Sequence, residues 1–422
     1  MPTRGRVGSA SVALQNSCRF KEMIPAEIIH REFPGLTGKT YLNAGAISLA
    51  PQRAIKAVER MIEIASARVD ANSGQIWGEF DSMLRSGRRN AAWLINADES
   101  EIALVESTTR GMTIAADAIP LAKGDRVLLC DMEYPAVALP WVQKQQTVGI
   151  EIDVVPNHGG EARVEDFAAK VTPRTKVIAI SSVQWTSGYR CDLAAMSKLC
   201  RENNIFLVVD AIQQLGAIPL DVKVTPADFI ACGGHKWLNA PFGAGFLYVN
   251  REAMPELNPI TAGLMGTVPP DGGWGIYLES PDAQAVRAYS FLDEARRYEV
   301  GGTTNFAGAA ALGASLSLMS ELGKDSIAQQ VHSVTGHLQT ELLRIGVRTV
   351  TELDHKHRGG IVAFDLGSAE RNRELARTLE AERITVSVRY SAGVGGVRVC
   401  CHFYNTIEDI DRLIDETRRF IS

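Results

Sequence analysis

Short apolar runs alternate with amphipathic stretches between residues 100 and 250, and this alternation predicts the architecture of that part of the chain. The runs are β-branched and nearly continuous, which is typical of strands buried on both faces of a sheet. A repeated order of strand and helix predicts a mostly parallel α/β sheet covered on both sides. We expect seven strands, at 101–105, 126–130, 151–156, 176–181, 205–210, 228–232 and 245–249, with helices at 109–120, 135–146 and 192–204.

The hydrophobic pattern changes at the loop-rich stretch 262–275 and then predicts a smaller α+β unit. The short turn between the last two large-sheet strands leads us to expect that they add an antiparallel edge. In the small unit we expect helices at 308–322, 326–343, 371–384 and 406–420, and strands at 360–366, 385–390 and 396–403. A chain of 422 residues is long enough for two domains. The predicted division is an N-terminal tail or arm (1–38), a large domain (39–265) and a small C-terminal domain (266–422) to which the N-terminal segment contributes.

Composition and charge exclude several classes of partner. A net charge of −5 gives no electrostatic reason to expect binding to nucleic acid or to an anionic membrane. No run approaches the roughly 20 apolar residues that span a bilayer, and residues 1–20 lack the apolar core of a signal peptide. The seven cysteines show no metal-binding spacing, so we expect no metal, and reduced thiols in a cytoplasmic protein. Cys130 and Cys232 are expected in the core.

Two polar residues stand where predicted strands end, which is the edge at which open α/β sheets bind ligands. Asp210 closes one strand, and alone it could be a helix N-cap. Lys236, in "GGHKWLNAP", follows the next strand, and alone it could be a surface lysine leaving the core. Together they fit pyridoxal phosphate, which needs a lysine for a Schiff base and an acid beside its ring nitrogen.

A third feature supports the same cofactor. In "VESTTRGM", the hydroxyl residues Ser107, Thr108 and Thr109 follow a predicted strand and open a predicted helix. A helix N-terminus presents free N–H groups and a positive dipole end to a phosphate. The conjunction of lysine, acid and phosphate site is more specific than any one of the three.

With these motifs in order, the chain resembles the class V aminotransferase family of fold-type I pyridoxal-phosphate enzymes over about residues 40–420. The resemblance implies that fold, with a large cofactor-binding domain and a smaller domain. It also implies pyridoxal phosphate as the cofactor, an amino acid or amine as the substrate, and a homodimer with shared active sites. The motifs are "YLNAGAISLAP", "ESTTRG", "EYPAVALPW", "DAIQQLG", "GGHKWLNAPFGAGFLYV", "YEVGGTTN" and "VRVCCHFYNTIEDID".

The resemblance implies a role for each matching position that would hold the cofactor. Lys236 corresponds to the Schiff-base lysine, and Asp210 to the partner of the ring nitrogen. Gln213 lies near the ring hydroxyl, while Tyr134 stands where the family usually has a histidine stacked on the ring. Gln184 and Trp185 are expected beside the ring. The expected phosphate contacts are Ser107, Thr108, Thr109 and His235, with Thr303 reaching the phosphate of the neighbouring subunit.

Other positions are expected to bind the substrate. Arg398 resembles the arginine that grips the α-carboxylate, which a guanidinium can bind through two parallel hydrogen bonds. Read alone, Arg398 could instead be a surface residue of a strand. Arg389 is a second candidate, and Asn43 with Ala44 falls in the segment that lines the family's substrate pocket. His355, His357 and Arg358 are expected in a solvated loop.

Besides Tyr134, the chain departs from the family in two further places. Gly233 stands where relatives often have a serine hydroxyl on the phosphate. The stretch "RYSAGVGG", residues 389–396, lacks the nucleophilic cysteine of cysteine desulfurases, and Cys400 and Cys401 come too late and inside a strand. We therefore predict an epimerase-like or aminotransferase-like enzyme acting at Cα, with C–S β-elimination as the alternative and cysteine desulfuration as less favoured.

Two functions of other classes fit the sequence less well. A non-catalytic scaffold of this fold would carry a broken constellation, whereas Lys236, Asp210 and the phosphate threonines are all present. A dinucleotide-binding dehydrogenase would need a G-x-G-x-x-G turn after the first strands, and none is there.

Overall fold

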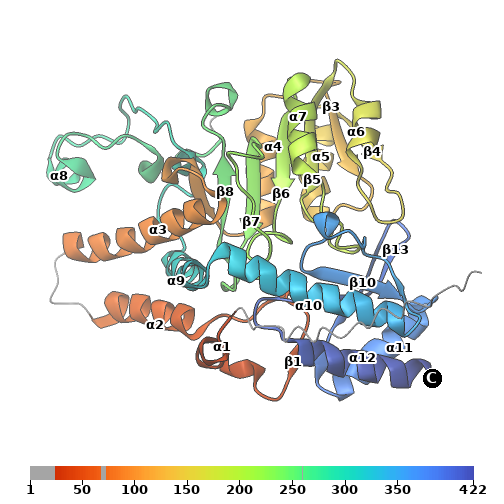
Figure 1. Ribbon diagram of the computed structural model, residues 1–422. Coiled ribbons are helices and arrows are strands. Elements are labelled where there is room, and N and C mark those ends of the chain that lie inside the picture. The colour runs from red at the N-terminus through yellow and green to blue at the C-terminus, as the bar shows by residue number, and fades with distance from the viewer. Residues whose placement is uncertain (1–23, 68–72, 259) are drawn as a thin grey trace, which may run out of the picture.

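A seven-stranded sheet forms the centre of the computed structural model, which describes residues 24–67, 73–258 and 260–422 (Figure 1). All seven strands predicted from the hydrophobic runs are present, with ends shifted by no more than one residue. In sheet order they are β2 (Ile102–Val105), β8 (Gly245–Val249), β7 (Phe229–Gly233), β6 (Phe206–Asp210), β5 (Thr175–Ser181), β3 (Arg126–Cys130) and β4 (Glu151–Val155).

One expectation about this sheet is wrong. β8 is antiparallel to its neighbours, as expected, but it lies inside the sheet between β7 and β2 instead of at the edge. The edge strand is β2, which pairs with β8 over Ile102 to Val105. The hydrophobic pattern reveals the local β7–β8 hairpin, whereas the strand on the other side of β8 comes from about 140 residues earlier in the chain.

Helices cover both faces of the sheet because apolar side chains alternate across it. Val177 and Ala179 face α4 (Thr108–Ala118) and α5 (Pro135–Thr147), while Ile178 and Ile180 face the opposite core. The predicted helices are confirmed within two residues at each end. The opposite face carries α3 (Ser73–Ile95), α6 (Val164–Lys170), α7 (Leu193–Glu202) and α9 (Phe306–Leu322), and α2 (Gln52–Ala67) packs on α9. Of these helices, α2, α3 and α6 were not predicted.

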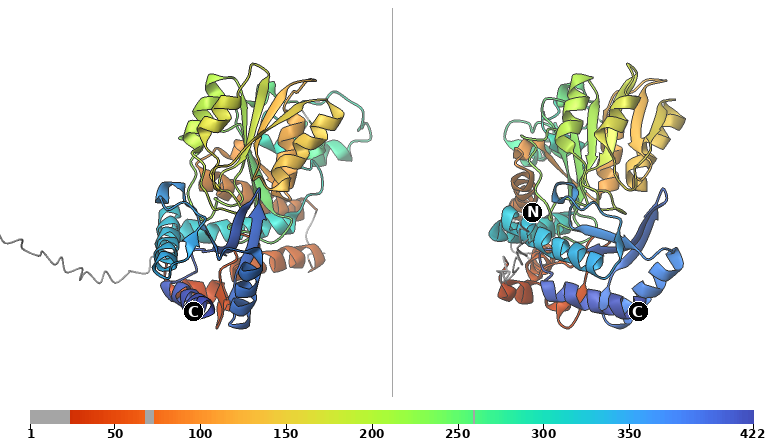
Figure 2. Two further views of the ribbon diagram at one scale, coloured as in Figure 1. Left: turned by 90° about the vertical axis from the view of Figure 1, so that its right-hand side faces the viewer. Right: turned by 45° about the vertical axis from the view of Figure 1, so that its right-hand side comes forward.

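A smaller antiparallel sheet stands beside the large one in Figures 1 and 2. Its core includes Val334, Phe364 and Val397, and the N-terminal Leu42 packs there too. The strand order is β12 (Ser387–Ser391), β13 (Val394–Cys400), β10 (Ile361–Asp365) and β9 (Arg348–Thr349), and β1 (Thr40–Tyr41) pairs separately with β11 (Ile384–Thr385). The helices of this unit are α10 (Lys324–Arg344), α11 (Ala369–Ala381) and α12 (Ile407–Ile421).

The segment between the two sheets belongs mostly to the large unit. Ala295 and Tyr298 pack in the large-sheet core, beyond the predicted boundary at residue 265. Helix α8 (Gly273–Glu279) lies at the far left of Figure 1, away from both sheets. No single helix in the described ranges is long and apolar enough to cross a membrane; α9 and α10 meet that test only as a pair bent by 80°.

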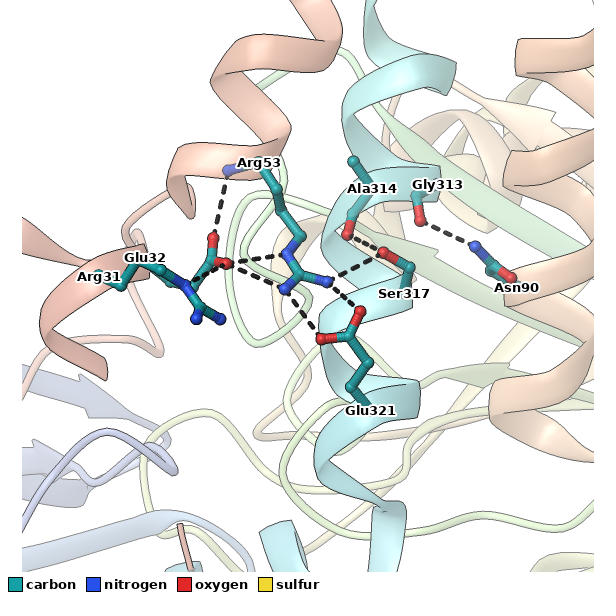
Figure 3. A network of polar contacts seen from close by, with 8 residues as sticks. All are labelled: Arg31, Glu32, Arg53, Asn90, Gly313, Ala314, Ser317 and Glu321. Carbon is teal, nitrogen blue, oxygen red and sulfur yellow. Dashed lines mark hydrogen bonds and ion pairs between the residues drawn. The ribbon is translucent and has the colours of Figure 1, made fainter. Parts of the chain in front are cut away.

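The N-terminal segment is held against α9 by one arginine. Arg53 of α2 donates to Glu32 of α1 (Ala26–Glu32) at 2.9–3.1 Å and to Glu321 of α9 at 2.6 and 2.9 Å (Figure 3). Phe33 is 2% exposed and packs on Phe403 and Tyr404. Residues 24–38 are therefore a folded part of the protein, which corrects the expectation of a tail from 1 to 38; residues 1–23 lie outside the described ranges.

Candidate active site

The turn "GGHKWLNAP" joins β7 to β8 at the carboxyl end of the large sheet. The Gly234 N–H donates to the Ala244 carbonyl at 2.7 Å, and the Ala240 N–H donates to the Gly234 carbonyl at 2.9 Å. A Cβ added to Gly234 would lie 2.8 Å from both Ala240 Cβ and the Ala244 oxygen, so only glycine fits. The turn is thus tightly closed, and it fixes the backbone from which Lys236 projects.

Lys236 is partly buried at this edge. Burial lowers the pKa of its amine to about 8; the Asp210 carboxylate opposes this shift and the charge of Arg398 adds to it. Lys236 Nζ lies 5.6 Å from the centroid of the Tyr134 ring. An amine with this pKa is partly neutral near pH 7, which suits it to act as a nucleophile and as a base.

Asp210, the last residue of β6, is a buried carboxylate at 3% exposure. It accepts a hydrogen bond from the Ile212 N–H at 2.9 Å, and no ion pair with it occurs among the described residues. Burial raises the pKa of Asp210 to about 6, against the opposing effects of the Ile212 N–H and Lys236. A buried acid without a cationic partner is a fitting place for a protonated nitrogen of a ligand.

The predicted phosphate residues gather at the start of α4. Ser107 caps the helix by accepting from the Arg110 N–H at 3.1 Å, and Thr109 is exposed in the first turn. The Thr108 hydroxyl accepts the Gly233 N–H at 2.8 Å, and a Cβ on Gly233 would lie 3.1 Å from that hydroxyl oxygen. The Thr108 hydroxyl therefore lies beside the position where relatives often have a serine, so it can donate to the same anion.

His235 directly precedes Lys236 in the chain. Its ring stacks on Phe242 with centroids 4.9 Å apart. Burial, with a smaller effect from the charge of Lys236, lowers the pKa of His235 to about 4. His235 is therefore a neutral ring near pH 7 that can donate one N–H to an anion.

An aromatic pair flanks Lys236 on the side of β3 and β5. Tyr134 follows β3, and its ring meets Trp185 edge to face at 5.3 Å. The Trp185 Nε1–H donates to the Met132 carbonyl at 3.0 Å, which fixes the indole. Tyr134 is 44% exposed, so it is free to cover a ring bound at Lys236.

A buried carboxylate that the sequence reasoning missed lies next to Asp210. Glu133 is 8% exposed and accepts bonds from the Ser181 N–H at 3.0–3.1 Å and from Gln184 Nε2 at 2.9 Å. Burial raises the pKa of Glu133 to about 7, and the charge of Asp210 adds to the shift. Gln184 Oε1 is buried without a partner, so the amide is held by Glu133 with its acceptor free. The signal for Glu133 was its place directly before Tyr134, just past a strand end.

We expect Glu133 to make the cofactor-free protein less stable as the pH rises. The pKa of Glu133 in the folded protein, about 7, lies above the ordinary value of 4.5. The protonated carboxyl therefore contributes its full stability to the fold below pH 4.5, and this contribution is lost as the pH rises through 7. The loss from this group is roughly 2–4 kcal/mol. Urea unfolding at pH 5 and pH 8 should show a smaller fall for Glu133→Gln than for the wild type; an equal fall would contradict the assignment.

Trp237 and Gln213 form a second buried pair under the turn. The fully buried Trp237 donates its Nε1–H to Gln213 Oε1 at 2.9 Å, and Gln213 Nε2 donates to the Gly45 carbonyl at 3.1 Å. Gly45 belongs to the predicted substrate segment, in which Ala44 is fully buried and Asn43 Oδ1 is buried without a partner. Gln213 thus ties this segment to the Lys236 turn; its expected contact with the ring hydroxyl stays a prediction.

The small sheet supplies two arginines to the same place. Arg398 of β13 is 2% exposed; its Nη1 donates to the Trp185 carbonyl at 2.9 Å, and its Nε to the Ser387 hydroxyl at 3.2 Å. The surface-arginine reading is therefore wrong for Arg398. Arg389 of β12 is half-buried and donates to the Val388 carbonyl at 2.8 Å. The site is built from both sheets, with Lys236 and Asp210 on one side and the arginines on the other.

The six cysteines within the described residues are all buried. β12 and β13 are joined by the two-residue turn Ala392–Gly393, whose positive φ values of 47° and 78° are typical of a tight hairpin. Cys400 and Cys401 are fully buried, as the sequence suggested. Cys130 and Cys232 are core residues, as expected. The hairpin therefore leaves no room for a mobile thiol at the place considered for desulfurase chemistry.

Two sequence expectations remain outside this cluster. In the loop 354–359, His355 is exposed as predicted, but Arg358 is 7% exposed and donates to Gln339 of α10, so the solvated-loop interpretation is wrong for it. Thr303 is exposed in the loop before α9, and its contact with a neighbouring subunit stays a prediction.

The donor set fits pyridoxal phosphate. It offers a partly neutral amine at Lys236, a buried carboxylate at Asp210 without a cationic partner, and a helix start with free N–H groups beside Thr108. Each complements one end of the cofactor: its aldehyde, its ring nitrogen and its phosphate. Arg398 is then placed to bind a substrate carboxylate.

Comparison with known proteins agrees with this fit. The family model for Aminotransferase class-V matches residues 40–413. Isopenicillin N epimerase of Streptomyces clavuligerus is 30% identical over 344 residues, which cover 80% of this chain and 84% of the relative. A probable cysteine desulfurase of Methanothermobacter thermautotrophicus is 27% identical over 412 residues, covering 93% and 96%.

Solved structures share the fold. A mutant of C-DES with glycine covalently linked to its pyridoxal-phosphate cofactor superposes with a TM-score of 0.82 at 24% identity, covering 92% of this chain and 98% of that one. The apo cysteine desulfurase of Thermococcus onnurineus gives a TM-score of 0.80 at 22% identity, covering 94% and 98%. With the match of the family model over most of its length, the chain belongs to the class-V aminotransferase family, as an enzyme of fold type I that uses pyridoxal phosphate.

Proposed function

We propose that the enzyme acts at Cα of an amino acid or amine substrate, with an epimerase-like or aminotransferase-like outcome. The observation that carries the proposal is the pairing of the Lys236 amine, whose pKa is about 8, with the buried Arg398 across one site. An arginine that binds the α-carboxylate sets the distance at which the Cα proton meets the lysine. The relative with a printed isomerase activity, isopenicillin N epimerase, supports the choice at 30% identity.

The chain's own residues perform the separate tasks of such a reaction. When bound, pyridoxal phosphate supplies an aldehyde for the amine and a ring that accepts electrons from Cα. Lys236 Nζ removes the Cα proton and can return it, because its pKa near 8 lets it hold or release a proton close to neutral pH. Arg398 orients the carboxylate, and Tyr134 with Trp185 keeps water from the reacting face.

Proton exchange at Cα tests the proposal, because epimerisation, transamination and C–S elimination all begin with loss of the Cα proton. The cofactor-loaded enzyme is incubated in D₂O with individual L- and D-amino acids, and nuclear magnetic resonance follows exchange at Cα. We expect exchange with at least one amino acid. Inverted substrate identifies epimerisation. Keto acid without ammonia identifies transamination, and keto acid with ammonia and a thiol product identifies C–S elimination. Loaded enzyme that exchanges no amino acid or amine would contradict the proposal.

We also propose a homodimer with shared active sites in the cytoplasm. Support comes from the exposed Thr303 and from apolar side chains exposed on the neighbouring segment 262–300. A large exposed apolar surface is typical of a protein interface. The most exposed of these side chains are Ile276, Leu278 and Val286.

A further inference from the structure

Arg389 and Arg398 lie on one face of the small sheet. In the β12–β13 ladder, Ser387 is opposite Arg398 and Arg389 is opposite Gly396. Opposite residues share a face, and so do residues two apart on one strand, so the arginines are diagonal neighbours. Burial and the charge of Arg398 both lower the pKa of Arg389, which places the guanidinium groups within electrostatic range. Gly396 has no side chain that would shield Arg389 from Arg398.

Neither arginine has an acidic partner among the described ion pairs. Arg398 donates to the Ser387 hydroxyl and the Trp185 carbonyl, and Arg389 to the Val388 carbonyl, all of them neutral acceptors. Elsewhere in the protein, Arg88, whose side chain is 11% exposed, is neutralised by Glu299 through two bonds of 2.9 and 2.8 Å. Two like charges held close together, one of them fully buried, are unfavourable unless anions join them.

Arg389 and Arg398 together carry more positive charge than one substrate carboxylate can neutralise. Of the nearby acids, Asp210 faces Lys236 and is expected to pair with the cofactor nitrogen. A single carboxylate binds one guanidinium fork through its two oxygens. If Arg398 takes the α-carboxylate, Arg389 is left beside Tyr134 with an unmet charge.

We propose that the substrate carries a second anionic group, a carboxylate or sulfinate on its side chain, and that Arg389 binds it. The inference rests on the proposed function, since it assumes that an amino acid occupies the site. It names a substrate class, amino acids with acidic side chains, and makes Arg389 the residue that selects it. The competing arrangement is that both arginines grip the same α-carboxylate.

Matched substrates separate the two arrangements. Values of kcat/KM are measured for L-glutamate against L-glutamine and for L-aspartate against L-asparagine, with the wild type and Arg389→Gln. We expect an acidic member to be preferred, and the variant to lose about 10–100-fold on it, as for one lost charge-assisted bond. The amide member should change by less than about threefold. Equal losses on both members, or no loss on either, would overturn the proposal. Arg348→Gln, an exposed arginine on β9 of the same sheet, is the control.

A binding measurement keeps this inference separate from the proposed function. Calorimetry compares glutarate, which has two carboxylates, with butyrate, which has one, on the cofactor-loaded protein and on the protein as purified. We expect glutarate to bind about tenfold or more tightly, and Arg389→Gln to remove that advantage. Binding of these two acids does not require turnover, so its outcome is independent of the proton-exchange test. Equal affinity for the two acids in the wild type would overturn the second-anion site.

Discussion

Replacing Lys236 with alanine should abolish covalent attachment of pyridoxal phosphate and lower kcat by at least about 10⁴-fold, because one amine serves as both nucleophile and general base. The measurements are the visible absorbance of the bound cofactor, the mass of the protein after borohydride reduction, and steady-state turnover. We expect the variant to remain folded, since the turn around Lys236 is held by backbone bonds of Gly234 and Ala240 and by the Trp237 indole.

Two controls make that result specific. Lys356→Ala removes an exposed lysine from the loop 354–359, and it should keep both the reduced-adduct mass and full turnover. Thermal unfolding of Lys236→Ala should match or exceed that of the cofactor-free wild type, because a partly buried charge is removed. Turnover of Lys236→Ala at the wild-type rate, with the fold intact, would contradict the assignment of the lysine.

The large sheet could be predicted because its strands carry a local signal. Runs such as 176–181 are apolar on both faces, and that pattern survives without knowledge of the partners. The place of β8 could not be predicted, because β2, its second neighbour, lies far away in the sequence. α3 was missed for a different reason: Gly78 and Gly87 lower its helix propensity, while its stability comes from packing against α9.

The residues of the site also divide into those with a clear local signal in the sequence and those that depend on distant residues. Lys236 and Asp210 could be predicted because Asp210 ends a strand and Lys236 closely follows the next one, and the carboxyl edge of such a sheet is where ligands bind. Glu133 gains its significance from Ser181 and Gln184, which are about 50 residues away, so its place directly before Tyr134 was only a weak local signal. The role of Trp237 likewise depends on a distant residue, because its indole holds Gln213. Burial, which shifts the pKa values, is a property of the assembled sheets.

Asp210→Asn tests the acid partner of the cofactor, and we expect it to lower kcat by about 10²–10⁴-fold while leaving the fold intact. Asparagine has nearly the same shape, and its side-chain oxygen can still accept the Ile212 N–H. What is lost is the negative charge opposite a ring nitrogen. Asp228→Asn is the matched control: its pKa is also raised by burial to about 6, but it lies just before β7, at the other end of the sheet.

The pH dependence distinguishes a charge effect from a loss of packing. The pKa of Asp210 in the cofactor-free protein is about 6, so the carboxylate is charged above that pH and neutral below it. Wild-type affinity for the cofactor, measured by equilibrium dialysis, should therefore weaken as the pH falls through 6. The same curve should be flat there for Asp210→Asn. A wild-type curve that is also flat would contradict the assignment.

A second consequence of Asp210→Asn concerns Lys236. The Asp210 carboxylate holds the pKa of the lysine up against burial, so its removal lowers that pKa below about 8. Covalent capture of the cofactor requires a neutral amine, and the rate of capture rises with pH through the pKa of Lys236. Stopped-flow absorbance should show this rise at lower pH in Asp210→Asn than in the wild type or in Asp228→Asn. An unshifted profile would mean that the two side chains are not coupled across the site, and the assignment of Asp210 as the charged partner in it would have to be abandoned.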